Sequence, residues 1–201
     1  DVAVPKMVMA RQCFDDTHLK DVEKAVHEQI TRPEIAARVH SGMRIAIGAG
    51  SRGIANIGIA VRATVQALRE LGAKPFVFPA MGSHGGATAE GQQAVLAGYG
   101  ITEEDVGAPI RATMDTVLIG KMEDGTPVHM DRYAHEADGV VLINRIKPHT
   151  SFRGPIESGV IKMMVIGMGK IQGATYLHAH GMDVFPEILP RVAAFIMEQT
   201  S

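Results

Sequence analysis

The sequence predicts an α/β fold in which helices flank a mainly parallel sheet, with a small hairpin added. Three observations predict it. Short apolar runs alternate along the chain with segments of helical spacing, as in strand–helix–strand units. Some of these runs are almost continuously apolar, which is typical of parallel strands buried on both faces. The composition, 46% hydrophobic and 21% charged residues, is that of a globular domain with a sizeable core.

The first part of the chain is predicted to hold a strand and two helices. Residues 7–12 alternate well enough to predict a first strand. Residues 17–29 show helical spacing of apolar side chains, and Asp15 or Asp16 stands where it could cap this helix. Residues 33–39 predict a second short helix, because the proline at its start is favoured in a first helical turn.

A strand–helix–strand unit follows. Residues 44–48 form an apolar run that ends in glycine and predict a buried parallel strand. Residues 57–71 are rich in Ala, Val and Leu and predict a helix that ends at Gly72. Residues 74–79 predict the next strand.

A looser version of this pattern fills the middle of the chain. Residues 89–99 predict a helix capped by Thr88, and a short helix begins at 102–104 with acidic residues in its first turn. Residues 115–130 predict a hairpin. Residues 139–146 are the stretch of the chain that most clearly predicts a buried strand.

The last part of the chain contains a loop at 148–154, an apolar stretch at 160–168 and a final amphipathic helix at 184–198. All these elements together predict a Rossmann-like three-layer sandwich. Ligands of such sheets bind beyond the carboxyl ends of the strands. Three polar loops fall at positions of that kind: 49–56, 80–88 and 147–159.

The composition excludes several classes of function. A net charge of −2 offers no basic field for nucleic acid or an anionic membrane, and the absence of Trp argues against base stacking. Cys13 is the single cysteine, which excludes an internal disulfide, a cysteine-ligated iron–sulfur cluster and a Cys-rich zinc site. Because the sequence shows no signal peptide and no long apolar run, we expect a cytoplasmic location.

The first polar loop predicts an anion-binding site. Ser51 and Arg52 lie in a glycine-rich loop between a strand and a helix, where backbone N–H groups and a forked guanidinium suit carboxylate or phosphate. The loop matches neither a Walker motif nor a dinucleotide fingerprint. A tight turn with a solvated arginine is the alternative.

His84 and His149 follow strands in the other two loops. His84 lies among small residues, where a histidine faces a cleft and exchanges protons near neutral pH. A hydrogen bond to its own loop explains it equally well. Pro148 stiffens the third loop and presents His149 at the expected ligand face, with a plain surface histidine as the alternative.

Two lysines and two further histidines compete for roles. Lys162 lies in an apolar stretch, where burial lowers a lysine pKa and makes the amine a nucleophile or covalent anchor. Lys170 is its competitor, and either could keep its charged end in water. His178 and His180 do not share a helix face, so at most one points at a given site. No HExxH or CxxC spacing specifies a metal.

The order of these motifs resembles that of the lactate racemase N-terminal domain family over nearly the whole chain. The motifs are Ser-Arg at 51–52, GSHGG at 82–86, Lys-Pro-His at 147–149, a lysine in an apolar run and a late histidine. The resemblance implies a nickel-pincer nucleotide, a pyridinium-3,5-bisthiocarboxylic acid mononucleotide that carries nickel. By that resemblance, Lys162 binds the cofactor covalently and His178 ligates the metal, since the sixteen-residue interval between them matches the family spacing.

The implied activity is a racemase or epimerase of a 2-hydroxy acid, lactate or a sugar acid, by hydride abstraction and return. His84 and His149 match the family's catalytic acid–base pair, because the hydroxyl proton of each enantiomer needs a base. Arg52, with Ser51 beside it, matches the arginine that holds the substrate's oxygens. Besides this small-molecule substrate, the implied partners are cofactor-biosynthesis proteins and a second copy in a homo-oligomer.

The sequence also departs from the family pattern. Ala49 stands where the family has an acid, and the segment 152–161 replaces a shorter glycine-rich stretch. Residues 1–201 correspond to the cofactor-binding N-terminal domain, and we expect the family's C-terminal domain to be absent from this chain. These departures indicate a divergent member. Two alternatives stay open: a zinc-dependent hydrolase that uses the histidines, and a non-catalytic anion-binding module.

Overall fold

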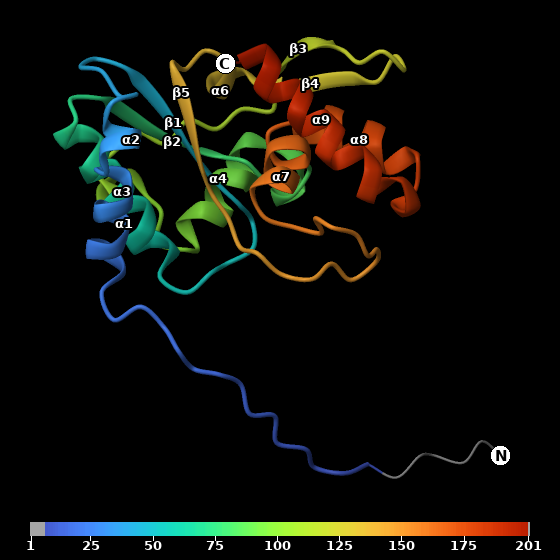
Figure 1. Cartoon of the computed structure of the whole chain (residues 1–201), viewed down its shortest axis with the longest axis horizontal. Helices are drawn as coiled ribbons and strands as arrows, with labels where there is room; N and C mark the ends of the chain where they lie inside the picture. The colour runs from blue at the N-terminus through green and yellow to red at the C-terminus, as the bar shows by residue number, and fades with distance from the viewer. Residues whose placement is uncertain (1–6, 201) are drawn as a thin grey trace.

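The centre of the fold is a three-stranded parallel sheet. A computed structural model describes residues 7–200. The strands are β1 (Arg44–Ala49), β2 (Lys74–Pro79) and β5 (Gly139–Ile143), in the order β2-β1-β5 (Figure 1). The register pairs Ala49 with both Pro79 and Ile143, so the three carboxyl ends lie side by side.

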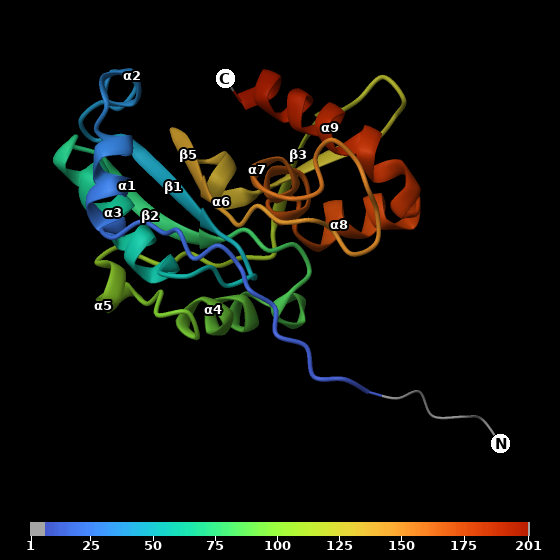
Figure 2. The same ribbon diagram turned by 60° about the horizontal axis from the view of Figure 1, so that its bottom comes forward.

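One face of the sheet is covered by helices from the first half of the chain (Figure 2). These helices are α1 (Val22–Ile30), α3 (Ile57–Glu70), α4 (Ala89–Ala97) and α5 (Glu103–Val106). The helix α3 packs on β1 and β2, and α1 packs on α3. Ile47 of the sheet and Val61 of α3 are completely buried in this core.

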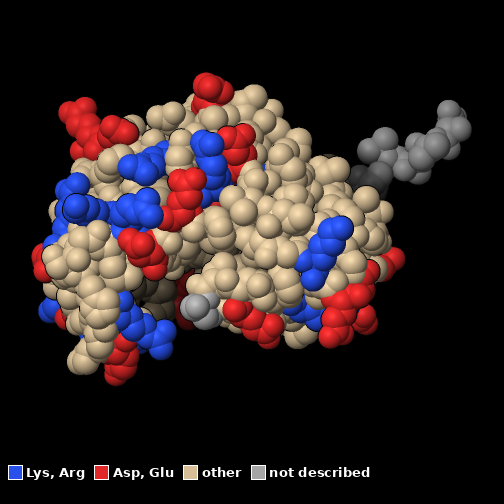
Figure 3. All heavy atoms as spheres, turned by 90° about the horizontal axis from the view of Figure 1, so that it is seen from above, with Lys and Arg blue, Asp and Glu red and all other residues tan. Residues whose placement is uncertain are grey.

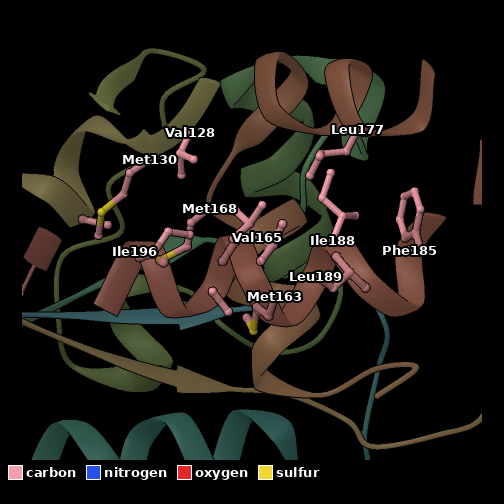
Figure 4. Close-up of a cluster of buried hydrophobic side chains, with 14 of the residues drawn as sticks. Val128, Met130, Met163, Val165, Met168, Leu177, Phe185, Ile188, Leu189 and Ile196 are labelled. Atoms are coloured by element: carbon pink, nitrogen blue, oxygen red, sulfur yellow. The ribbon is translucent and has the colours of Figure 1, made fainter. Parts of the chain in front are cut away.

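The other face is covered by a hairpin and the C-terminal helices. These elements are β3 (Thr116–Lys121), β4 (Pro127–Asp131), α7 (Val160–Lys162), a π-helical turn (Met163–Gly167), α8 (Lys170–Ala179) and α9 (Phe185–Thr200). Their apolar side chains converge in a second core, where Met130, Met163 and Leu189 are almost fully buried (Figure 4). The described residues also form two short helices, α2 (Pro33–Ala36) and α6 (Arg132–His135), and two 3₁₀ turns, at Gly85–Ala87 and Met182–Val184.

The predicted α/β architecture is confirmed: a parallel sheet flanked by helices, with a small antiparallel hairpin. The strand at 74–79 is found as predicted. Thr88 caps α4, since its hydroxyl accepts a hydrogen bond from the N–H of Gly91 at 3.0 Å. Gly72 follows α3 with a φ of +87°, the left-handed conformation that ends a helix.

The predictions for residues 7–39 are partly wrong. Residues 7–19 form neither helix nor strand and are exposed, because no neighbouring strand pairs with them in the described structure. The first helix begins only at Val22. Its cap is Asp21, whose carboxylate accepts from the N–H of Lys24 at 2.9 Å, rather than Asp15 or Asp16. The helix α2 ends at Ala36, earlier than the predicted residue 39.

The strand predicted at 139–146 is found, but it is shorter than predicted and is not buried as predicted. β5 lies at the edge of the sheet and ends at Ile143, because β1 offers no pairing beyond Ala49. Val140 is 36% exposed as a result. The apolar stretch at 160–168 is helical and includes the π-helical turn. The predicted 184–198 helix begins at Phe185 and extends to Thr200.

The surface carries both signs of charge. On the face seen in Figure 3, basic and acidic side chains are interspersed, as the small net charge of −2 leads one to expect. No helix in the described part of the chain has both the length and the apolar character needed to span a bilayer.

Candidate functional site

A cavity of about 600 Å³ lies at the carboxyl ends of the three parallel strands. Its walls come from the loops after these strands and from the helical segment 162–178. The six candidate site residues all line it: Ser51, Arg52, His84, His149, Lys162 and His178. The fold therefore gathers, in one cavity, side chains from widely separated parts of the chain.

The loop after β1 supplies a serine and an arginine. The hydroxyl of Tyr99 donates a hydrogen bond to the carbonyl of Ser51 at 2.7 Å and holds this loop in place. The hydroxyl of Ser51 in turn hydrogen-bonds Nδ1 of His84. Among residues 7–200, no side chain forms a hydrogen bond or ion pair with the exposed guanidinium of Arg52. Arg52 is therefore available to bind a carboxylate or phosphate through its forked N–H groups.

Glycines shape the loop that carries His84. Gly82 and Gly85 have φ angles of +61° and +64°, which glycine adopts at no steric cost. Gly85 also packs so closely on the start of α4 that a Cβ there would lie 2.7 Å from the backbone nitrogen of Gln92. Backbone geometry thus explains the glycines of the GSHGG motif.

The environment of His84 favours its neutral form. Burial has the largest effect and lowers the pKa of His84 below its ordinary value. The neighbouring charges of Arg52, Lys162 and His178 lower this pKa further. A neutral imidazole at neutral pH can accept a proton, as a general base must.

Contacts on three sides hold His149. Its ring packs on Phe152 with a centroid separation of 4.3 Å. Its backbone N–H donates to Oε2 of Glu157 at 2.7 Å. The N–H of Ser151 donates to the ring Nδ1 at 3.2 Å, so the neutral ring carries its proton on Nε2. Burial, followed by the charge of Lys162, lowers the pKa of His149.

Lys162 is half-buried and faces the cavity from the end of α7. Its ammonium lies 5.8 Å from the ring centroid of Phe152 and makes no hydrogen bond or ion pair within residues 7–200. Burial is the main reason why its pKa is lowered, with contributions from Lys147 and Arg52. A lysine with a lowered pKa and no acidic partner has the properties of a reactive amine.

Lys170 has a different environment. It is fully buried and does not line the cavity. Its ammonium lies 3.1 Å from Oδ2 of Asp131 and donates to the carbonyl of Pro79 at 2.5 Å and to Oε1 of Gln92 at 2.9 Å. All three contacts are internal to the fold, so Lys170 is enclosed by structural partners.

The two histidines of the His-Ala-His motif are also separated by the fold. His178 lines the cavity, and its Nδ1 donates to the carbonyl of Ala174 at 2.5 Å. A carbonyl can only accept, so Nδ1 carries the proton and Nε2 of the neutral ring has a free lone pair. His180 makes the same type of bond to Tyr176 at 2.9 Å but does not line the cavity.

The cavity also contains residues that sequence reasoning missed. These residues are Arg145, Asn144 and Ser158. Together with Lys147 of the Lys-Pro-His motif, Arg145 adds positive charge to that of Arg52 and Lys162, and Asn144 and Ser158 add hydrogen-bonding groups. Arg145 falls within the strand predicted at 139–146, but β5 ends at Ile143, so Arg145 lies in the loop that follows.

Glu157 is the acidic residue of the cavity lining. Its carboxylate accepts the N–H groups of His149 and Gly154 and lies 3.7 Å from Arg153. Its charge is therefore committed to internal partners. The electrostatic field of the cavity favours a ligand with several negative charges.

The two departures from the family pattern have different structural consequences. Ala49 is completely buried in the core beneath α3 and does not line the cavity. The segment 152–161 does reach the cavity, since Glu157 and Ser158 belong to it. Ser158 accepts a hydrogen bond from the N–H of Lys147 at 2.7 Å, so this segment fastens the loop that carries His149.

The side chains present can provide a single metal ligand more readily than a complete metal site. Within the described residues, no three His, Cys, Asp or Glu side chains are grouped so that they could hold a metal ion. His178, with Nδ1 fixed by a carbonyl and Nε2 free, has the geometry of a metal-binding histidine whose second nitrogen is oriented by the backbone.

Comparison with known proteins identifies the family. No curated protein matches this chain with significant similarity. The family model of the lactate racemase N-terminal domain matches residues 6–186, which is most of the chain. The matched residues include all six candidate site residues and every loop that forms the cavity. The chain therefore belongs to the lactate racemase N-terminal domain family.

Proposed function

We propose that this chain is the cofactor-binding part of a racemase or epimerase that acts on a 2-hydroxy acid and depends on a nickel-pincer nucleotide. The observation that carries the proposal is the convergence on one cavity of an unpaired lysine, two histidines of lowered pKa and a histidine with a free Nε2. The proposal includes the cytoplasmic location and the cofactor-biosynthesis partners expected from the sequence.

The residues present fit the cofactor. The amine of Lys162 would form the covalent link, and the lowered pKa of Lys162 raises the fraction of the amine that is uncharged. Nε2 of His178 would ligate nickel. The positive charges of Arg145 and Lys147 suit the phosphate of a mononucleotide.

The bound cofactor would supply an acceptor for the substrate's α-hydrogen and its electron pair. The guanidinium of Arg52 binds the substrate carboxylate, with Ser51 beside it. One of the two histidines, His84 or His149, removes the hydroxyl proton as the carbonyl forms and returns it when the carbonyl is reduced. Two bases serve the two enantiomers, and their lowered pKa values keep both neutral near pH 7.

The decisive experiment is the intact mass and nickel content of the protein after co-expression with the cofactor-biosynthesis enzymes. We expect one mass increment, located on Lys162, and one nickel per modified chain. Lys162→Ala removes the increment, whereas Lys121→Ala, which changes an exposed lysine at the end of β3 outside the cavity lining, keeps it. An unmodified Lys162 under conditions that load a known cofactor-dependent racemase would refute the proposal.

A second experiment tests the reaction type with a 2-hydroxy acid deuterated at the α-carbon. We expect the deuterium to stay on the α-carbon of the racemised product in ordinary water, because the hydrogen moves with its electrons and returns within the site. Complete exchange of the label with solvent would instead indicate proton abstraction from carbon. A panel of lactate and sugar acids then identifies the side chain that the enzyme accepts.

A further inference from the structure

Three polar side chains are completely buried beneath the His84 loop, outside the cavity. They are Gln92 of α4, Asp131 at the end of β4 and Lys170 at the start of α8, each 0% exposed. The ammonium of Lys170 joins the other two, because it lies 3.1 Å from Oδ2 of Asp131 and donates to Oε1 of Gln92 at 2.9 Å. None of the three takes part in the proposed chemistry.

The orientation of the Gln92 amide follows from its partners. An ammonium can only donate, so it must face Oε1, and the amide nitrogen is left to face acceptors. Nε2 of Gln92 donates to the carbonyl of Gly82 at 2.8 Å and to the carbonyl of His84 at 3.1 Å. The loop that carries His84 is therefore tied at two points, Gly82 and His84, to one amide group, and that amide is held by Lys170.

The same lysine also holds the end of the strand before the loop. Its ammonium also donates to the carbonyl of Pro79, the last residue of β2, at 2.5 Å. The chain runs from Pro79 through Gly82 to His84, so Lys170 holds the beginning of this stretch directly and the rest of it through Gln92. Lys170 itself has a φ of +50°, which non-glycine residues rarely adopt.

Stability alone does not explain this group. Burying a lysine and a carboxylate removes both from water, and replacing such a buried pair by well-packed apolar residues is often neutral or stabilising in proteins. Burial lowers the pKa of Lys170 and raises that of Asp131, which shows the cost of desolvating both charges. Three apolar side chains would have no donor for the carbonyls of Gly82 and His84, so they could not hold the loop in its position.

We propose that Gln92, held by the buried Lys170–Asp131 pair, is the residue that positions His84 against the cavity. The role of His84 in proton transfer rests on the proposed function, but the positioning by Gln92 does not. The positioning is measurable in the protein without cofactor.

The test compares two variants of α4 by NMR of the histidine rings in the unloaded full-length chain. Gln92→Met keeps the volume of the side chain but cannot donate to the carbonyls of Gly82 and His84. Leu96→Ala is the matched control, because Leu96 is also 0% exposed on α4 but is an apolar side chain in the core that contains Ile47 and Val61. We expect the His84 ring signals and titration to shift in Gln92→Met and not in Leu96→Ala, with the His149 signals unchanged in both.

A second variant and a measurement without mutation keep the test decisive if Gln92→Met does not fold. Gln92→Glu retains an acceptor for Lys170 but has no donor, so it should shift the His84 signals as Gln92→Met does. In the unaltered protein, the side-chain amide protons of Gln92 should exchange at least 100-fold more slowly than those of exposed glutamines. Rapid exchange, or His84 signals that match the parent protein in every folded Gln92 variant, would overturn the proposal.

Activity then separates this proposal from the proposed function. In loaded enzyme, Gln92→Met should lower kcat by roughly 10- to 100-fold with KM little changed, because a small displacement of a proton-transfer group slows the chemical step. Shifted His84 signals in a protein that never acquires cofactor or racemase activity would refute the proposed function and leave the positioning role standing.

Discussion

His178 donates a hydrogen bond from Nδ1 to the carbonyl of Ala174, one turn earlier on α8, at 2.5 Å. This bond fixes the tautomer of the neutral ring and leaves Nε2 as the nitrogen with a free lone pair. His180 makes the equivalent bond to Tyr176, but its ring packs on Tyr176 at 4.9 Å, outside the cavity lining. The two histidines therefore form a natural pair of test residue and control.

The first prediction concerns nickel. In protein loaded by co-expression, His178→Ala should lower the nickel content to background while the organic mass increment on Lys162 remains, because the metal loses its protein ligand. His180→Ala should keep one nickel per modified chain. Elemental analysis together with intact mass measures both quantities, and equal nickel in the two variants would contradict the assignment of His178.

The second prediction concerns the proton-transfer groups. Arg52→Met should raise the pKa of His84 and leave that of His149 unchanged. The reason is that the charge of Arg52 lowers the pKa of His84 but does not contribute to the lowered pKa of His149. Lys147→Met should do the reverse, since its charge lowers the pKa of His149 but not that of His84. NMR titration of the unloaded protein checks both variants. Identical shifts at the two histidines would show that the charges do not act separately.

The third prediction gives the sign of the pH dependence. The pKa values of folded His84 and His149 lie below the ordinary 6.5, so the unfolded chain binds their protons more tightly. Stability should therefore fall as the pH decreases below about 6.5. The acid limb of the pH profile of kcat/KM should likewise lie below that value, because both bases stay neutral to lower pH. Denaturant unfolding between pH 5 and 7, with His84→Gln as the comparison, measures the contribution of His84 to stability.

The fourth prediction separates backbone strain from crowding in the His84 loop. Gly85→Ala and Gly86→Ala both place a Cβ at positive φ, with parent φ angles of +64° and +67°. Only at position 85 does the Cβ meet backbone atoms, at 2.7 Å, whereas position 86 has no atom within 4 Å. We expect Gly86→Ala to lower the free energy of unfolding by about 1 kcal/mol. Gly85→Ala should cost roughly 1–3 kcal/mol more. Equal losses in urea unfolding would argue against the close contact with α4.

The fifth prediction concerns the clamp on the His149 loop. Glu157→Ala removes the acceptor for the N–H groups of His149 and Gly154, so the loop should become more mobile and kcat should fall roughly 10- to 100-fold. Glu198→Ala, which changes an exposed glutamate near the end of α9, should leave kcat unchanged. Hydrogen exchange of residues 147–154 and steady-state kinetics test the two effects together. Unaltered exchange in Glu157→Ala would show that other contacts hold the loop.

Local patterns predicted most of the helices and strands correctly. The strand at 74–79 and the start of α3 at Ile57 are as predicted, because an apolar run bounded by glycine or proline limits the local conformations severely. The predictions fail where pairing with a distant segment of the chain determines whether a strand forms. Residues 7–12 have the alternation of a strand but no strand beside them, and 139–146 are cut short where β1 stops pairing.

The candidate site likewise contains parts that the sequence predicts and parts that it does not. The three loops that form the cavity could be located from the sequence, because parallel strands bring their carboxyl ends together. Glu157 and Gln92 could not be found in this way, since each acts through hydrogen bonds to backbone groups eight to ten residues away. No residue pattern marks a side chain whose partners are main-chain carbonyls or N–H groups.

The sequence by itself determined the α/β class, the three polar loops and the set of histidines and lysines that could carry chemistry. It could do so because secondary structure and turns depend mainly on neighbouring residues. Only the tertiary structure decided the environment of each lysine and histidine. Lys162 faces the cavity without an acidic partner, whereas Lys170 is enclosed by Asp131 and Gln92. Burial and pairing are properties of contacts between distant segments, and those contacts exist only once the chain has folded.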